Sequence, residues 1–333
     1  MTISTVIHRF LRTGYCKTPR EPQWDRTVGR LCRPLLFLTV AGLAAAACSA
    51  EAACRVYPLE DAPGWMMENE LVKVRLRPDI HGTIDDMRLT SNGLMTIYPY
   101  KKTRKELVPG TGVYGLARKP VSGCSDAMWP RMIDRFRAPY TLDVISNTPE
   151  QVRVRMSLET DAWRIERVLS LRQGESALDL HGTFTLKQGD SENSCYWFQC
   201  FLRLGDTLLS MDGDASELLL MPVRKEEQRF QGVTAPVPEA HVRRRNPGDR
   251  KGHFIPPAQP WMAAVDRTEK LIFATVFQEA DFPADMVFYS WEGRGTTYSM
   301  EAIYPRRTFG PGDTVTHRIR LMVLAGFNGV DLV

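Results

Sequence analysis

Apolar and polar residues alternate along much of the chain after residue 68. The clearest runs are 71–76, 151–156 and 314–321, where apolar residues occupy about every second position. A period of two over six or more residues predicts a half-buried β-strand, because successive side chains of a strand point to opposite faces. We predict further strands at 163–171, 177–186, 196–204, 271–277, 286–291 and 297–303.

Turn residues separate these strands. Glycine-containing clusters at 172–175, 187–190 and 310–313 interrupt the alternation, as expected where a chain reverses direction. No amphipathic helix of three turns is predicted after residue 50. Many short strands without helices predict an all-β protein with two large sheets in a single domain, residues 51–333. The segment 223–260, rich in Pro, Arg, Glu and Gly, has no strand pattern and is predicted to be a surface or site-bordering loop.

The first fifty residues form a different kind of segment. Seven basic residues precede the apolar run 35–47, which ends in small residues around Cys48. This order is typical of a secretory signal peptide, and the apolar run is shorter than the roughly 20 residues that span a bilayer. We therefore expect export to the periplasm or the cell exterior, without a membrane span. A lipid anchor at Cys48 is the alternative, although the leucine usual three positions earlier is absent.

Removing this leader changes the charge of the protein. The chain has 43 basic and 39 acidic residues, of which residues 1–50 contain seven and two. Residues 51–333 therefore carry 36 and 37 and are almost neutral. The basic pI belongs to the leader, so we predict no nucleic-acid partner.

Four cysteines follow the leader: Cys54, Cys124, Cys195 and Cys200. Export would permit disulfides. Cys195 and Cys200 are not expected to pair within one strand, because five extended residues span roughly 16 Å and the odd spacing places them on opposite faces. A bond between Cys54 and Cys124 is open. No pair has the CxxC spacing of a zinc or redox site, and we predict neither a metal nor a cofactor.

Three stretches together resemble the galactose mutarotase-like (aldose epimerase-like) proteins. They are the opening segments 68–74 and 77–84, the central strands 163–185, and the closing segments 298–305 and 309–313. No stretch is specific alone; their order and spacing, over most of residues 66–325, carry the resemblance. It implies a large two-sheet antiparallel β-supersandwich and a sugar ligand.

The resemblance also implies an acid–base site. In mutarotases, a glutamate takes the proton from the anomeric hydroxyl and a histidine protonates the ring oxygen, and Glu301 lies where the family glutamate would fall. The alternative is a structural Glu301 paired with Arg306 or Arg318. The family histidine does not carry over, because 196–199 reads Tyr-Trp-Phe-Gln. His181, on the polar side of a predicted strand, is the replacement candidate, and a solvated strand face is its alternative.

Four residues are candidates for holding the sugar. Gln199 lies in the central segment that lacks the histidine, and Arg118 could replace the basic segment of the family. Trp129 and Trp291 lie at predicted loop or strand ends, where flat rings can stack on a sugar. The basic cluster 243–250 would suit an acidic glycan, because Arg pairs with carboxylate and sulfate groups in a bidentate way; a solvated loop is its alternative.

Three functions remain open from the sequence. The first is an exported enzyme that acts on an anomeric centre or glycan linkage. The second is a carbohydrate-binding protein that has lost the acid, and the third is a non-catalytic structural or assembly module of the cell envelope. The fold alone does not decide among them.

Overall fold

The structure, a computed structural model, describes residues 53–60, 63–94, 96–97, 123–129, 139–202, 217–222, 241–244, 253–266, 268–290 and 298–326. These residues lie in one compact unit, Ala52–Gly326. They form two antiparallel sheets and a short 3-10 helix, Glu279–Asp281, and none of them is in an α-helix. Among them, no helix is long and apolar enough to cross a membrane.

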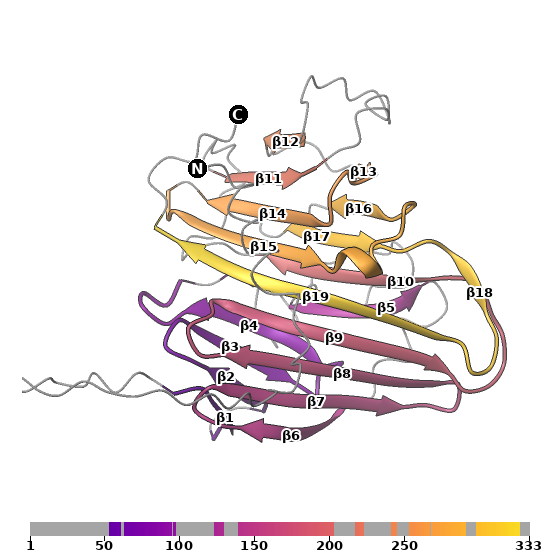
Figure 1. Ribbon diagram of the computed structural model, residues 1–333, viewed down its shortest axis with the longest axis horizontal. Helices are drawn as coiled ribbons and strands as arrows, with labels where there is room; N and C mark the ends of the chain where they lie inside the picture. The colour runs from indigo at the N-terminus through magenta and orange to yellow at the C-terminus, as the bar shows by residue number, and fades with distance from the viewer. Residues whose placement is uncertain are drawn as a thin grey trace, which may run out of the picture. The chain divides into compact units, whose positions relative to one another are not determined.

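Ten strands make up the first sheet (Figure 1). In spatial order they are β1 (Arg55–Pro58), β2 (Trp65–Glu68), β3 (Val72–Arg77), β4 (Thr83–Leu89), β5 (Cys124–Trp129), β10 (Ser191–Leu202), β17 (Tyr298–Ile303), β16 (Val287–Ser290) and β13 (His253–Ile255). The short β18 (Arg307–Phe309) also pairs with β10.

The second sheet has nine strands. Its order is β12 (His241–Arg244), β11 (Glu217–Met221), β14 (Trp261–Asp266), β15 (Leu271–Phe277), β19 (Thr314–Ala325), β9 (Ala177–Leu186), β8 (Trp163–Arg172), β7 (Gln151–Glu159) and β6 (Thr141–Asn147). The long β19 joins the two halves of this sheet, because it pairs with β15 along one side and with β9 along the other.

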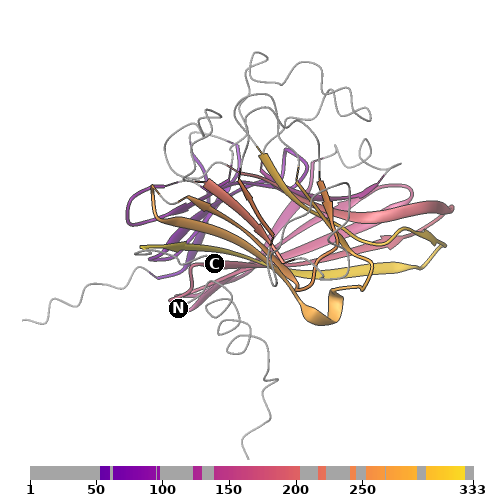
Figure 2. The same cartoon turned by 90° about the horizontal axis from the view of Figure 1, so that it is seen from above.

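The apolar faces of the two sheets pack against each other and form one core (Figure 2). Trp163 and Leu169 of the nine-stranded sheet and Phe198 of the ten-stranded sheet are each at most 1% exposed. On β8 and β9 these core residues alternate with half-buried or exposed ones. The period of two therefore separates an inner apolar face from an outer face on each sheet.

The predicted fold class, an antiparallel β-supersandwich of two large sheets, is confirmed. The strands 177–186 and 271–277 have the predicted bounds, and glycines with positive φ form the three predicted turns: Gly174, Gly189 and Gly312. The expectation that 223–260 contains no strand was wrong, because β12 and β13 lie within it. Both are short strands that pair with neighbours distant in sequence. They are too short for an alternation of apolar and polar residues to predict them.

Candidate functional site

Glu301 lies on the outer face of the ten-stranded sheet. It occupies the middle of β17, and its neighbours in the strand, Met300 and Ala302, belong to the core. On the adjacent β10, Phe198 and Cys200 also belong to the core, so Trp197 and Gln199 point to the outer face. Gln199 is directly opposite Glu301 in the strand register.

Three hydrogen-bond donors hold the Glu301 carboxylate. Trp197 Nε1 donates to Oε2 at 2.7 Å, and Gln199 Nε2 donates to Oε1 at 2.9 Å. The Ser299 hydroxyl also donates to Oε1. No arginine among the described residues forms an ion pair with this carboxylate, so the alternative pairing with Arg306 or Arg318 is not observed. Arg318 instead donates to Gln278 Oε1, at 2.5 Å.

The protonation of Glu301 reflects two opposing effects. The residue is only 1% exposed, and burial in a medium of low polarity disfavours a charged carboxylate. Burial therefore raises the pKa of Glu301, while the donors from Ser299, Gln199 and Trp197 lower it; the result is a pKa of about 7. A carboxyl group with this pKa can both accept and release a proton near neutral pH.

A row of polar side chains crosses the outer face at Glu301. In register across four neighbouring strands lie Tyr289 of β16, Glu301 of β17, Gln199 of β10 and Ser125 of β5. Directly opposite residues in antiparallel strands share a face and have Cβ atoms about 5 Å apart. Tyr289, Gln199 and Ser125 are half-buried. Together with the half-buried Trp197, they offer ring surface and polar groups around one carboxyl group.

The structure brings together two of the predicted site residues, Glu301 and Gln199, and separates His181 from them. His181 is an exposed residue of β9 in the nine-stranded sheet, and its neighbours Leu180 and Gly182 are buried. It therefore lies on the outer face of the other sheet, on the far side of the core from Glu301. Burial and the Arg318 guanidinium lower its pKa.

The remaining predicted site residues are not placed in full. Arg118, Trp291, Cys48 and residues 245–250 of the basic cluster 243–250 lie outside the described residues, and the other two residues of the cluster end β12. Trp129 ends β5 and is paired with Cys195 in the register, but its side chain also lies outside the description. Trp197, Ser299 and Tyr289 were not among the site residues predicted from the sequence. A period-two pattern could have found the first two, because each lies two residues from a selected residue on the same strand.

A buried polar network joins the two sheets within the core. Asp126 of β5 forms an ion pair with Arg167 of β8, and His317 Nε2 of β19 lies 3.1 Å from Asp126 Oδ2. The Tyr196 hydroxyl donates to the same oxygen at 3.2 Å. Arg167 Nη1 also donates to the carbonyl of Gly82 at 2.9 Å. His317 is 0% exposed and is therefore a core histidine.

This network does not form a sugar site. A cavity of about 10 Å³ lies beside Asp126 and Arg167, and this volume holds at most one water molecule. No group of three His, Cys, Asp or Glu residues that could hold a metal ion occurs among the described residues. The network therefore ties the sheets together through charge and hydrogen bonds.

The structure does not contain the Cys54–Cys124 disulfide that the sequence left open. A disulfide joins Cys124 to Cys200, while Cys54 and Cys195 are free and buried. The expectation that Cys195 and Cys200 do not pair with each other is confirmed. Cys124 and Cys200 are opposite each other in the β5–β10 register, with Cα atoms 4.1 Å apart.

No family model and no curated protein matches this chain by sequence. Solved structures with the same fold do exist. A galactose mutarotase-like protein from Clostridium acetobutylicum has a TM-score of 0.56 at 8% identity, over 83% of this chain and 100% of that one. Another from Lactobacillus casei has a TM-score of 0.50 at 11% identity, over 78% and 99%.

A TPR-domain containing protein from Parabacteroides distasonis also has a TM-score of 0.56, at 11% identity. The match covers 80% of this chain and 48% of that protein, so this chain spans about half of its length. At sequence identities of 8–11%, the similarity shows a shared fold and nothing more. The protein thus has the galactose mutarotase-like fold, a large antiparallel β-supersandwich of two sheets.

Proposed function

We propose that this protein binds a sugar or glycan on the outer face of the ten-stranded sheet, with Glu301 as the hydrogen-bonding centre. The observation that carries the proposal is the Glu301 carboxyl group, which is buried and, among the described residues, is held by three donors and paired with no arginine. Maintaining such a group costs stability. Proteins commonly retain such costly buried groups at ligand-binding and catalytic sites.

The surroundings of Glu301 suit a carbohydrate. A sugar offers hydroxyl groups that donate hydrogen bonds. Within the described part of the chain, Oε2 of Glu301 accepts one hydrogen bond, from Trp197, although a carboxylate oxygen can accept two. Aromatic rings stack on the CH faces of sugars, and Trp197 and Tyr289 lie on the face that carries Glu301. Galactose mutarotase-like structures share this fold, which supports the proposal.

Acid–base chemistry on a sugar is the second candidate function. The observation in its favour is the pKa of about 7 at Glu301, which matches the requirement for a general base near neutral pH. Among the described residues, those that donate hydrogen bonds to Glu301 are Trp197, Gln199 and Ser299, and none of the three is the acid that mutarotation needs. Binding is therefore the primary proposal, and proton transfer is its extension.

Export of the chain belongs to the same proposal. The basic and apolar order of residues 1–50 supports it, and so does the Cys124–Cys200 disulfide. Disulfides form and persist in oxidising compartments such as the periplasm and the cell exterior.

A ligand screen tests the binding proposal. Residues 51–333 would be screened by thermal shift and calorimetry against neutral sugars, uronates and sulfated oligosaccharides. A ligand at 100 times its Kd should stabilise the protein by about 2.7 kcal/mol. We expect a hit that Glu301→Gln weakens at least about tenfold, whereas Glu166→Gln on the other sheet leaves it unchanged.

The same screen separates the alternatives. A hit that His181→Asn abolishes and Glu301→Gln preserves would move the site to the nine-stranded sheet. The absence of any hit would favour the structural or assembly module. For a ligand that binds, the rate of anomer exchange, measured by NMR in wild-type protein and in Glu301→Gln, decides whether Glu301 transfers a proton.

A further inference from the structure

The ten-stranded sheet has a weak junction between β4 and β5. In the described residues these strands share one registered pair, Ile84 with Cys124. By contrast, β5 pairs with β10 over six residues. Among the described residues, the direct pairing of β4 with β5 is therefore much shorter than the pairing of β5 with β10.

A second short segment lies in line with β5 at this junction. Thr96 donates to the Met87 carbonyl of β4 from its backbone N at 2.9 Å and from Oγ1 at 2.7 Å. The next residue, Ile97, forms a bridge with Leu202 of β10. The 96–97 segment and the beginning of β5 thus lie one after the other between β4 and β10.

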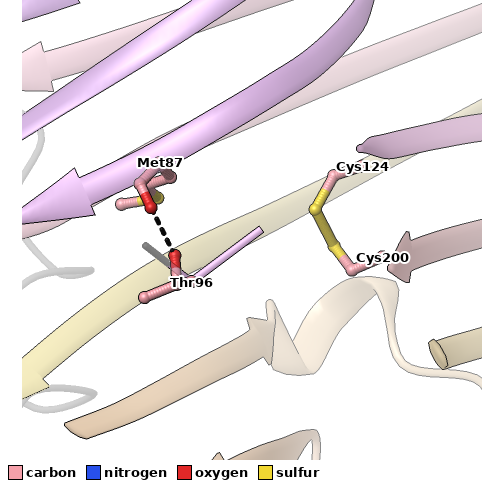
Figure 3. Close-up of a disulfide and its surroundings, with 4 residues drawn as sticks. All are labelled: Met87, Thr96, Cys124 and Cys200. Atoms are coloured by element: carbon pink, nitrogen blue, oxygen red, sulfur yellow. Dashed lines mark hydrogen bonds between the residues drawn. A yellow bond between two sulfur atoms is a disulfide. The ribbon is translucent and has the colours of Figure 1, made fainter. Parts of the chain in front are cut away.

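The Cys124–Cys200 disulfide is located at this junction, close to the Thr96–Met87 hydrogen bond (Figure 3). Cys124 contacts both sides, since it is paired with Ile84 of β4 and bonded to Cys200 of β10. Gly123 is also pressed against β4, because a Cβ there would lie 2.2 Å from Thr83 Cγ2. The covalent bond therefore fixes Cys124, the residue of β5 that pairs with β4, to Cys200 at the end of the β5–β10 ladder.

The disulfide is also one residue away from the Glu301 site. Cys200 follows Gln199, and Cys124 precedes Ser125, which is opposite Gln199 in the register. Because successive residues of a strand point to opposite faces, the disulfide lies on the core side and these two polar side chains lie on the outer side. The position of Gln199 in turn determines its 2.9 Å hydrogen bond to Glu301.

We propose that the Cys124–Cys200 disulfide is the positioning element of the Glu301 site, so that the protein holds its sugar tightly only in the oxidised form. A dithiol reductant would transfer two electrons and two protons to the disulfide, which becomes two thiols while the reductant becomes a disulfide. Without the bond, only ladder pairing holds this end of β5 to β10, beside Ser125 and Gln199, and the end of the ladder opens more often. The distance from Gln199 to Glu301 then varies, and small displacements of this kind reduce the effectiveness of a site severely.

A variant that keeps apolar volume at both positions tests this proposal. Cys124→Val/Cys200→Val removes the bond and leaves two β-branched residues opposite each other in antiparallel strands, a pairing that sheets accommodate well. Cys54→Ala, which removes a free and buried cysteine of the same core, is the control. Three quantities would be measured: the sugar Kd, the pH midpoint of the Glu301 carboxyl by ¹³C NMR, and hydrogen exchange of β5 and β10.

We expect the double variant to fold and to bind sugar at least about tenfold more weakly. Its Glu301 midpoint should be shifted, and its hydrogen exchange in β5 and β10 should be faster. Cys54→Ala should match the wild type in all three. Wild-type affinity, midpoint and exchange in the double variant would overturn the proposal. If the double variant does not fold, the Glu301 midpoint and the hydrogen exchange of β5 and β10 are compared in wild-type protein with and without a dithiol. Equal values in the two samples would overturn the proposal.

The affinity measurement rests on the proposed function, but the other two do not. If the wild-type protein binds none of the sugars, the sugar-binding proposal fails. The carboxyl midpoint and the hydrogen exchange would then still show whether the disulfide positions the Glu301 site.

Discussion

The imidazole of His317 lies directly over Gly182, its partner on the neighbouring strand. The two residues are opposite each other in the β19–β9 register, and a Cβ at position 182 would stand 2.1 Å from His317 Cε1 and Nε2. The ring cannot easily move away, because it stacks on Tyr196 with ring centroids 3.9 Å apart. A histidine in this core therefore requires a glycine beside it.

We predict that Gly182→Ala destabilises the protein by about 2 kcal/mol, as overpacking in a core usually does. The free energy of unfolding in urea measures the effect. In a His317→Ala background the clash is absent, so the same substitution should cost little. An equal cost in both backgrounds would contradict the assigned contact.

The buried Asp126–Arg167 pair should be costly to break from one side. Asp126→Asn or Arg167→Met leaves an unpaired buried group, and we expect each to reduce stability by about 3–5 kcal/mol. Asp126→Leu/Arg167→Met removes both charges and should cost much less than the sum of two single changes. Urea unfolding of the variants measures this difference, and strict additivity would show that the pair is not coupled.

The same pair predicts a loss of stability in acid. Burial alone would raise the pKa of Asp126, but the Arg167 guanidinium and His317 together lower it below its ordinary value of 3.8. A carboxyl group with a lowered folded-state pKa contributes stability above its unfolded pKa and loses that contribution as pH falls. Unfolding free energies between pH 5 and pH 2 should therefore fall more steeply in the wild type than in Asp126→Asn.

Glu301 should produce the opposite dependence on pH. Its pKa is about 7 in the folded protein, against an ordinary value of 4.5, so the folded state binds the proton more tightly than the unfolded state. Stability is then lost as pH rises from about 4.5 to 7, by about 3 kcal/mol at one pKa unit per 1.36 kcal/mol. The difference between wild-type protein and Glu301→Gln, followed by urea unfolding from pH 5 to pH 8, isolates this contribution. A constant difference across that range would refute the raised pKa.

The two free cysteines should be unreactive in the native protein. Burial raises the pKa of both the Cys54 and the Cys195 thiols to about 11, so almost no thiolate, the reactive form, exists at pH 8. Alkylation followed by peptide mass spectrometry should show no label at either residue in native protein and full label after denaturation. Rapid native labelling of Cys195 would show that the outer face at β10 is open to solvent.

Part of the site could be predicted from the sequence. Glu301 was selected through the family resemblance, and period-two spacing places Ser299 on its face and Trp197 on the face of Gln199. The pairing of Gln199 with Glu301 could not be read from the chain, because the register between β10 and β17 joins residues about a hundred positions apart. The sequence also could not show that His181 and Glu301 lie on different sheets, because alternation identifies a polar face without identifying its sheet.

The sequence by itself determined the local character of this protein, because alternation and turn glycines act over a few residues. It predicted the all-β class and the main strands. Only the tertiary structure decided which strands are neighbours. That decision placed Cys124 beside Cys200, 76 residues away, and Asp126 beside Arg167 on the opposite sheet. Such contacts depend on how two sheets bury their apolar faces together, and no local pattern of residues encodes them.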